Sequence, residues 1–211
     1  IAGNDEIRGD TYEAIYFDAG IRHSTVNIGP ATVAIDGTAT AFGGNGTIRG
    51  GDDAIEFMYI LDSNVTVAGN TTIEGDDDGI DANDDIEDGS TLTIADNGSI
   101  TGHGLFGDPG KGITIDGAII DSTVAVTGNT TILGETGDGV LFDSPVTNST
   151  VTVSDNGAIT GQDGHGVVFE DMIQDSTVSV SGNSQVSGHE DGILFAGLID
   201  PSTVDISDNT L

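Results

Sequence analysis

Short runs in which every second residue is apolar recur along the whole chain. Each run begins at Ser-Thr-Val or a related triplet, and the most regular copies start at Ser122, Ser149 and Ser176, about 27 residues apart. Alternation of β-branched and polar residues, bounded by Gly, Asn and Asp, predicts β-strands. No stretch shows helical periodicity. Repetition at this spacing is typical of a solenoid in which each repeat stacks on the next.

Within one repeat the pattern predicts three short strands. The first is the Ser-Thr-Val run, the second is centred on one aliphatic residue such as Ile132, and the third resembles Gly139–Phe142. The predicted fold is an all-β, right-handed, single-stranded parallel β-helix with three strands per coil, since strand crossovers prefer the right hand. We expect about 26–27 residues per coil, roughly seven coils, and a single domain over residues 1–211.

Stacking of the repeats places like residues in columns about 4.8 Å apart. Four apolar columns are expected to form the core, and one of them lies three residues before each repeated Ser: Ile21, Ile60, Ile119, Val146, Ile173 and Ile199. A polar column of Asn follows the first strand: Asn4, Asn45, Asn70, Asn97, Asn129, Asn156, Asn183 and Asn209. Asn tolerates the left-handed backbone conformation, and stacked amides hydrogen-bond to one another. This column is therefore predicted to be a structural ladder.

Two coils are longer than the others. The first carries an insert at residues 29–44, and the second carries a smaller insert at residues 101–112. Inserts in solenoids map to loops, where function often resides. The chain begins with Ile and shows no capping element. We expect an excised or processed part of a longer chain, or a protomer that stacks head-to-tail into filaments.

The charge of the chain is strongly acidic. Asp and Glu number 36 against four Lys and Arg, which gives a formal net charge of -32. Nucleic acid is excluded as a partner because almost no positive charge faces the phosphates, and anionic lipid surfaces are excluded for the same reason. No apolar run is long enough for a transmembrane helix, so no direct membrane insertion is expected. The absence of Cys leaves the redox compartment open.

The acidic residues concentrate in one turn of the repeat. The cluster predicted to bind a metal ion consists of Asp52, Asp53, Asp76, Asp77, Asp78 and Asp81. Carboxylates stacked at this spacing repel one another unless they are solvated or bridged by a cation. Calcium is the proposed cofactor, since it takes carboxylate and carbonyl oxygens in flexible geometry. The alternative is a solvated acidic edge that blocks aggregation.

The same turn contains the weak catalytic candidates Asp52, Asp53, Arg49 and His103. Gly51–Asp53 and Gly102–Gly104 resemble fragments of the polygalacturonase pattern, but no Arg-x-Lys motif follows them. Paired carboxylates serve glycoside hydrolysis when one of them stays protonated. Because the repeat itself generates such motifs, we expect no enzyme, with a polysaccharide hydrolase or lyase as the alternative.

Two outward columns are candidate interaction surfaces. The middle residue of the third strand becomes apolar in the C-terminal coils, at Leu141, Val168 and Leu194. An exposed stripe there indicates a partner-binding surface, whereas the alternative is that a neighbouring loop covers it. The outward positions of the first strand are rich in Thr, which resembles ice-binding β-solenoids. That array is broken by Asn, Ala and Asp, so ice binding is the less favoured alternative.

The phrases Ile73–Asp84 and Asn97–Gly117 resemble repeats of bacterial autotransporter passenger domains and surface adhesins. This resemblance covers nearly the whole chain, although the repeat is degenerate. It implies an extracellular or cell-surface location and a structural or adhesive role as a stalk, adhesin or filament. The partners it implies are a second copy of the chain or a glycan or protein of a host or cell surface.

Overall fold

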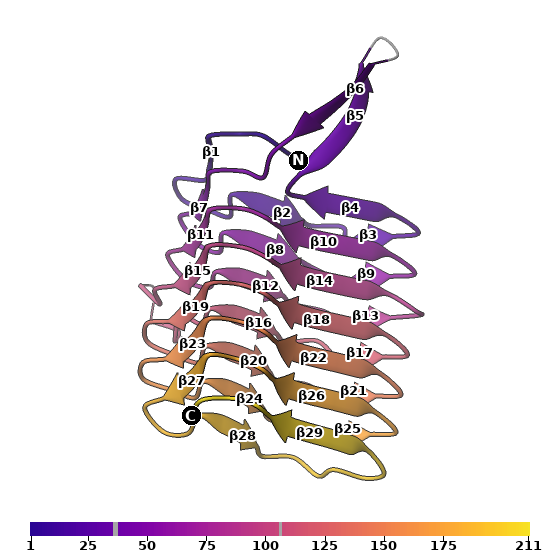
Figure 1. Ribbon diagram of the computed structural model, residues 1–211, viewed down its shortest axis with the longest axis vertical. Coiled ribbons are helices and arrows are strands. Elements are labelled where there is room, and N and C mark those ends of the chain that lie inside the picture. The colour runs from indigo at the N-terminus through magenta and orange to yellow at the C-terminus, as the bar shows by residue number, and fades with distance from the viewer. Residues whose placement is uncertain (36–37, 106) are drawn as a thin grey trace.

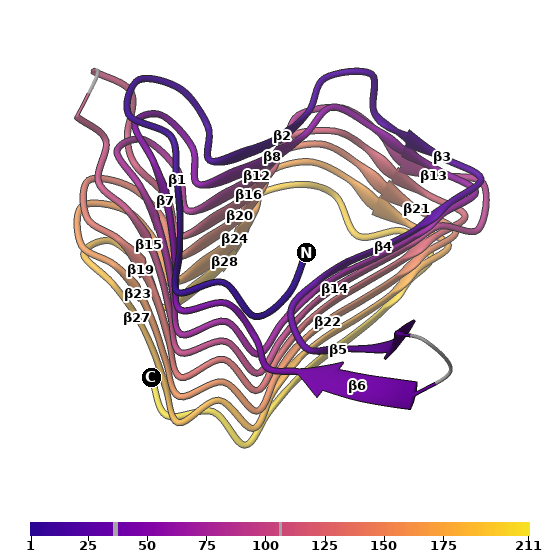
Figure 2. The same cartoon turned by 90° about the horizontal axis from the view of Figure 1, so that it is seen from above.

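The computed structural model describes residues 1–35, 38–105 and 107–211, with only the backbone strands described within 31–42. The chain winds into a stack of coils whose strands all run parallel, apart from one hairpin (Figure 1). Seen from the N-terminal end, the chain runs clockwise as the coils recede, so the solenoid is right-handed (Figure 2). The predicted parallel β-helix of about seven coils is confirmed.

Three sheets correspond to the three predicted strands of each coil. The first sheet contains β4 (Thr25–Ile28), β10 (Asn64–Ala68), β14 (Thr91–Ala95), β18 (Thr123–Thr127), β22 (Thr150–Ser154), β26 (Thr177–Ser181) and β29 (Thr203–Ser207). The second contains β1 (Glu6–Arg8), β7 (Thr47–Gly50), β11 (Thr72–Gly75), β15 (Ser99–Gly102), β19 (Thr131–Gly134), β23 (Ala158–Gly161) and β27 (Gln185–Gly188). The third contains β2 (Ile15–Phe17), β8 (Ile55–Phe57), β12 (Ile80–Ala82), β16 (Ile113–Ile115), β20 (Val140–Phe142), β24 (Val167–Phe169) and β28 (Ile193–Phe195).

A fourth sheet adds a strand that the alternation did not predict. Its two-residue strands are β3 (Ile21–Arg22), β9 (Ile60–Leu61), β13 (Ile86–Glu87), β17 (Ile119–Ile120), β21 (Val146–Thr147) and β25 (Ile173–Gln174). Two residues are too few to display period-2 alternation, so only the apolar column was visible in the sequence. Ile86 also belongs to that column, but the sequence interpretation did not include it. It lies four residues before Ser90 because Gly89, at φ 77°, lengthens the corner.

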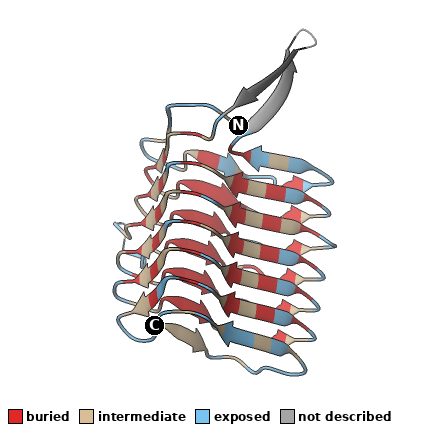
Figure 3. Ribbon diagram, in the orientation of Figure 1, coloured by how far each residue is buried: buried red, intermediate tan, exposed pale blue. Residues whose placement is uncertain are grey.

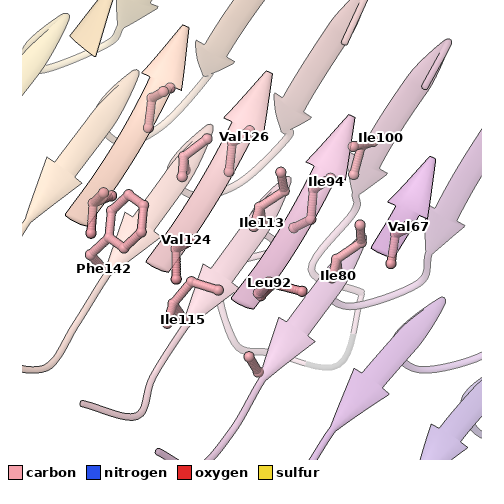
Figure 4. Close-up of a cluster of buried hydrophobic side chains, with 14 of the residues drawn as sticks. Val67, Ile80, Leu92, Ile94, Ile100, Ile113, Ile115, Val124, Val126 and Phe142 are labelled. Carbon is pink, nitrogen blue, oxygen red and sulfur yellow. The ribbon is translucent and has the colours of Figure 1, made fainter. Parts of the chain in front are cut away.

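The core consists of the inward-facing residues of all four sheets. Alternate residues are buried along strands of the first and second sheets, such as β18 and β11, whereas β8, β12, β16, β20 and β24 of the third sheet are buried at all three positions (red in Figure 3). Side chains from different sheets meet in the interior, among them Leu92, Ile94, Ile113 and Phe142 (Figure 4). Phenylalanines also stack along the axis, with ring centroids 4.4 Å apart for Phe142 and Phe169. The register, which places equivalent residues of successive coils next to one another, therefore follows directly from the repeat.

Two polar ladders run inside the solenoid. The predicted Asn ladder is present: the amide nitrogen of each Asn donates to the amide oxygen of the next, at 2.9 Å between Asn97 and Asn129. The left-handed residue is the one before the Asn, such as Asp96 (φ 53°) or Gly128 (φ 67°), and not the Asn itself; Asn45 alone in the ladder lacks it. The repeated Ser forms a second ladder that was not predicted. Its hydroxyl accepts from the backbone N–H of the preceding Ser, at 3.0 Å between Ser122 and Ser149.

The insert at 29–44 forms an antiparallel hairpin where the sequence suggested a loop. Strands β5 (Ala31–Ile35) and β6 (Thr38–Phe42) pair with Ala31 opposite Phe42. The hairpin projects beyond the N-terminal coils (Figure 1). The residues between the strands, 36–37, lie outside the described part of the chain, as does residue 106 in the second insert.

Candidate functional site

The acidic turn joins the second sheet to the third in two successive coils. Asp52 and Asp53 lie between β7 and β8, and residues 76–78 lie between β11 and β12. Each turn folds back tightly on the strand before it. A Cβ on Gly50 or Gly75 would lie 1.7 or 1.8 Å from a carbonyl oxygen of its own turn. Only glycine permits this approach, so the turn holds its carboxylates at the edge of the third sheet.

Two groups of carboxylates form at this edge. Asp53, Glu56 and Asp81 form the inner triad, and Asp52, Asp53 and Asp77 form the outer triad; in each, the oxygens lie within 4.8 Å of one another. Asp53 is common to both. Glu56 and Asp81 occupy paired positions on β8 and β12. The acidic clusters could therefore hold a metal ion, in agreement with the coarser part of the sequence prediction.

The two strand residues of the inner triad are buried although they face away from the core, and Asp53 is half-buried. Glu56 and Asp81 are each 7% exposed. The segments on both sides of the third sheet project past it, as seen along the axis in Figure 2. Glu56 accepts a hydrogen bond from the side-chain amide of Asn83. In contrast, the Oδ1 atom of Asp81 is buried and accepts no hydrogen bond, and the same holds for Oδ1 of Asp77.

The electrostatics of the two triads are unfavourable for ionised carboxylates. Burial, followed by repulsion from Asp53 and other acids, raises the pKa of Asp81 to about 9. Burial also raises the pKa of Asp53 to about 8, that of Glu56 to about 7 and that of Asp77 to about 6. Since buried charge is stable only when it is paired, these groups need either protons or a cation.

Two of the six predicted metal ligands lie outside both triads. Asp76 accepts a hydrogen bond from the guanidinium of Arg49 at 2.9 Å. Asp78 accepts from the backbone N–H of Lys111 and from the Thr114 hydroxyl, both at 2.6 Å. The ammonium of Lys111 is also 3.7 Å from Asp78. Sequence spacing placed these acids in the cluster, but donors from neighbouring coils bind them. Glu56 was not predicted as a ligand, although it is paired in register with the predicted ligand Asp81.

The four catalytic candidates separate into two groups. Asp52 and Asp53 belong to the triads, whereas Arg49 and His103 meet at Glu74. The His103 ring lies between two carboxylates, with Nε2 3.0 Å from Glu74 and Nδ1 2.9 Å from Glu135. This chain of ion pairs joins strand ends of successive coils. Glu135 was not singled out in the sequence, because the turns of this repeat contain many acids.

The apolar stripe predicted for a partner is not exposed in its central coils. Leu141 is 7% exposed and Val168 is fully buried, while Leu194 is half-buried. The exposure on which the partner-binding hypothesis rested is therefore absent at Leu141 and Val168. Their burial agrees with the alternative, in which neighbouring segments cover the outward face of the third sheet. The outward side of a strand does not reveal such cover in a sequence.

Comparison with known proteins returns no similarity. No protein-family model matches the chain, no curated protein matches it, and no solved structure matches it. Within the described residues, no helix has the length and apolarity needed to span a bilayer.

Proposed function

We propose that the chain is a structural segment of an extracellular surface protein, a stalk stiffened by calcium in its acidic turn. The observation that carries the proposal is the continuity of the two side-chain ladders from coil to coil. Each ladder Asn bonds the next coil through its amide, and each ladder Ser does so through its hydroxyl. Such ladders link every coil to its neighbours, so the coils resist bending and separation.

The resemblance to autotransporter passengers and adhesins supports the surface location. A stalk of this kind presents an adhesive segment or contacts a second copy, a glycan or a protein of a neighbouring surface. Its net charge of -32 keeps rods apart unless cations neutralise it. Calcium is the cation proposed for the acidic turn, since it is a hard ion that prefers carboxylate oxygens and extracellular modules bind it.

Location is tested by labelling intact cells of the source organism with antibodies raised against the purified chain. We expect labelling of intact cells and its loss after external protease treatment. Labelling that requires cell lysis would refute the surface location. Electron microscopy of the purified chain then distinguishes isolated rods from head-to-tail filaments.

The non-catalytic part is tested by incubating the protein with uronic-acid polymers and neutral polysaccharides. We expect no change in polymer length. Turnover that disappears in an Asp52→Ala variant would replace this proposal with a carbohydrate-active enzyme.

A further inference from the structure

The part of the proposed function that concerns calcium can be assigned to particular atoms. We propose that the inner triad, Asp53, Glu56 and Asp81, is the calcium site, and that the bound ion joins the coil of β8 to the coil of β12. This assignment rests on the proposed function only in its choice of ion. Its geometry stands on the triad itself, in which all three carboxylates lie within 4.8 Å.

One carboxylate oxygen of Asp81 has no hydrogen-bond partner. Asp81 is 7% exposed, and its Oδ1 atom accepts no hydrogen bond. A buried carboxylate oxygen without a donor is strongly unfavourable, so native structures pair such atoms with a donor or an ion. The same carboxyl group has two further carboxylates near it, because Asp53, Glu56 and Asp81 each have an oxygen within 4.8 Å of the others. A cation at this point satisfies all three groups at once.

The positions of Glu56 and Asp81 are occupied by apolar residues in the C-terminal coils. Residues on the outward column of the third sheet are paired in register: Glu56, Asp81, Thr114, Leu141, Val168 and Leu194. The fold accepts apolar side chains there, because Val168 is fully buried and Leu141 nearly so. The two acids therefore do not serve the packing of the sheet. They place negative charge at a buried position that apolar residues fill elsewhere.

The neighbouring basic side chains pair with acids outside the inner triad. Lys111 directs its ammonium to Asp78, and Arg49 pairs with Glu74 and Asp76. None of these three acids belongs to the inner triad. Among the described residues, the nearby side-chain cations are thus matched with other carboxylates. Within the described part of the chain, no ion pair joins a basic side chain to the inner triad.

The ligand chemistry selects a hard divalent cation. The triad offers carboxylate oxygens only, without the His nitrogen or Cys sulfur that zinc prefers. Three carboxylates supply up to six oxygens, and water completes the shell of calcium. Because Asp53 and Glu56 come from one coil and Asp81 from the next, the ion acts across the pairing of β8 with β12. Removal of the ion leaves mutual repulsion across the same contact.

The test combines calcium titration calorimetry with hydrogen exchange of the purified full chain. We expect calcium to slow amide exchange in β8 and β12, and chelator to reverse the effect, while β20 and β24 stay unchanged. Asp81→Leu installs the residue that Leu141 provides in its own coil, so this variant keeps the fold. It should lower calcium affinity by more than about tenfold, since ligand charge sets the affinity of such sites.

Two matched variants make the assignment falsifiable. Asp84→Asn alters an exposed acid of the same coil, and Asp52→Asn alters the outer triad alone. Both should retain calcium binding. If Asp81→Leu keeps full affinity while Asp52→Asn loses it, or if calcium leaves exchange in β8 and β12 unchanged, the inner triad is not the site. Calcium binding elsewhere would then leave the proposed stalk intact, and failure of surface labelling would leave this assignment intact.

Discussion

Truncation of one ladder residue, Asn129→Ala, tests how much the internal Asn ladder stabilises the solenoid. The Asn129 side chain is fully buried and makes four hydrogen bonds. Its amide nitrogen donates to the Asn156 side chain and to the Ile94 carbonyl oxygen, both at 3.0 Å. Its amide oxygen accepts from the side-chain and backbone nitrogens of Asn97, at 2.9 and 3.1 Å. Alanine removes all four and leaves their partners buried.

The expected loss follows from these contacts. A typical intramolecular hydrogen bond contributes about 1 kcal/mol net, and a buried partner left unsatisfied costs about 1–3 kcal/mol. Four lost bonds therefore predict a decrease of about 4 kcal/mol in the free energy of unfolding. The matched control is Asn64→Ala, which alters an exposed Asn at the start of β10. That change should lie within about 0.5 kcal/mol of the native chain, as exposed substitutions do.

The measurement is equilibrium unfolding in urea, followed by circular dichroism and by tyrosine fluorescence. Agreement of the two probes establishes that the coils unfold together, which the linear extrapolation requires. The Asn129→Ala midpoint should fall well below that of Asn64→Ala at an unchanged slope. A loss for Asn129→Ala no larger than that for Asn64→Ala would refute the argument. In that case the apolar columns alone would stabilise the stack.

Three further predictions concern the charged groups. In the presence of chelator, Asp81→Leu should raise the melting temperature relative to the native chain, because it replaces a buried unpartnered carboxylate by an apolar residue. The measurement is differential scanning fluorimetry, and an unchanged or lower melting temperature would contradict the prediction. The metal-free chain should lose stability progressively as pH rises from about 4 to about 9. Burial raises the pKa of Asp53 to about 8 and that of Asp81 to about 9, so between the unfolded Asp pKa of about 3.9 and these values the folded state holds protons that the unfolded state has released. Melting temperatures that show no decline between about pH 5 and pH 9 would refute this prediction. Burial lowers the pKa of His103, but hydrogen bonds to Glu135 and Glu74 outweigh it and raise that pKa. The resulting stability is present below the unfolded pKa of about 6.5 and is lost as pH rises through the folded value, so His103→Gln should remove that part of the pH profile.

The columns of the core were predictable because their signal is repeated in every coil. Val151 and Val178 occupy equal places in the repeat, and the structure pairs them in register. The sequence of a single coil would predict only a few ambiguous short strands, whereas the repeated sequence predicts both the strands and their register. The second polar ladder had the same periodic signal in its Ser residues. Its role escaped notice because a serine at a strand start has many ordinary explanations.

What could not be predicted depends on the turns between strands. Alternation tells which side of a strand a residue occupies, and by that rule Glu56 and Val168 both face outward. Their burial comes from segments that project past the third sheet, whose reach depends on turn shape. For the same reason the sequence grouped Asp76 and Asp78 with the metal ligands. Their donors, Arg49 and Lys111, belong to other coils and are brought close only by the fold.

The charge of the inner triad can be neutralised in the native chain either by protons or by a bound ion. These two possibilities have opposite consequences for stability. If protons neutralise Asp53, Glu56 and Asp81, the chain is most stable in mild acid and indifferent to calcium. If an ion neutralises them, calcium stabilises the chain at neutral and alkaline pH, where the carboxylates are ionised and bind it best. Both effects act through the same three side chains, so Asp81→Leu should weaken both together. A variant that loses the calcium response but keeps the full pH dependence would show that the two effects have different origins.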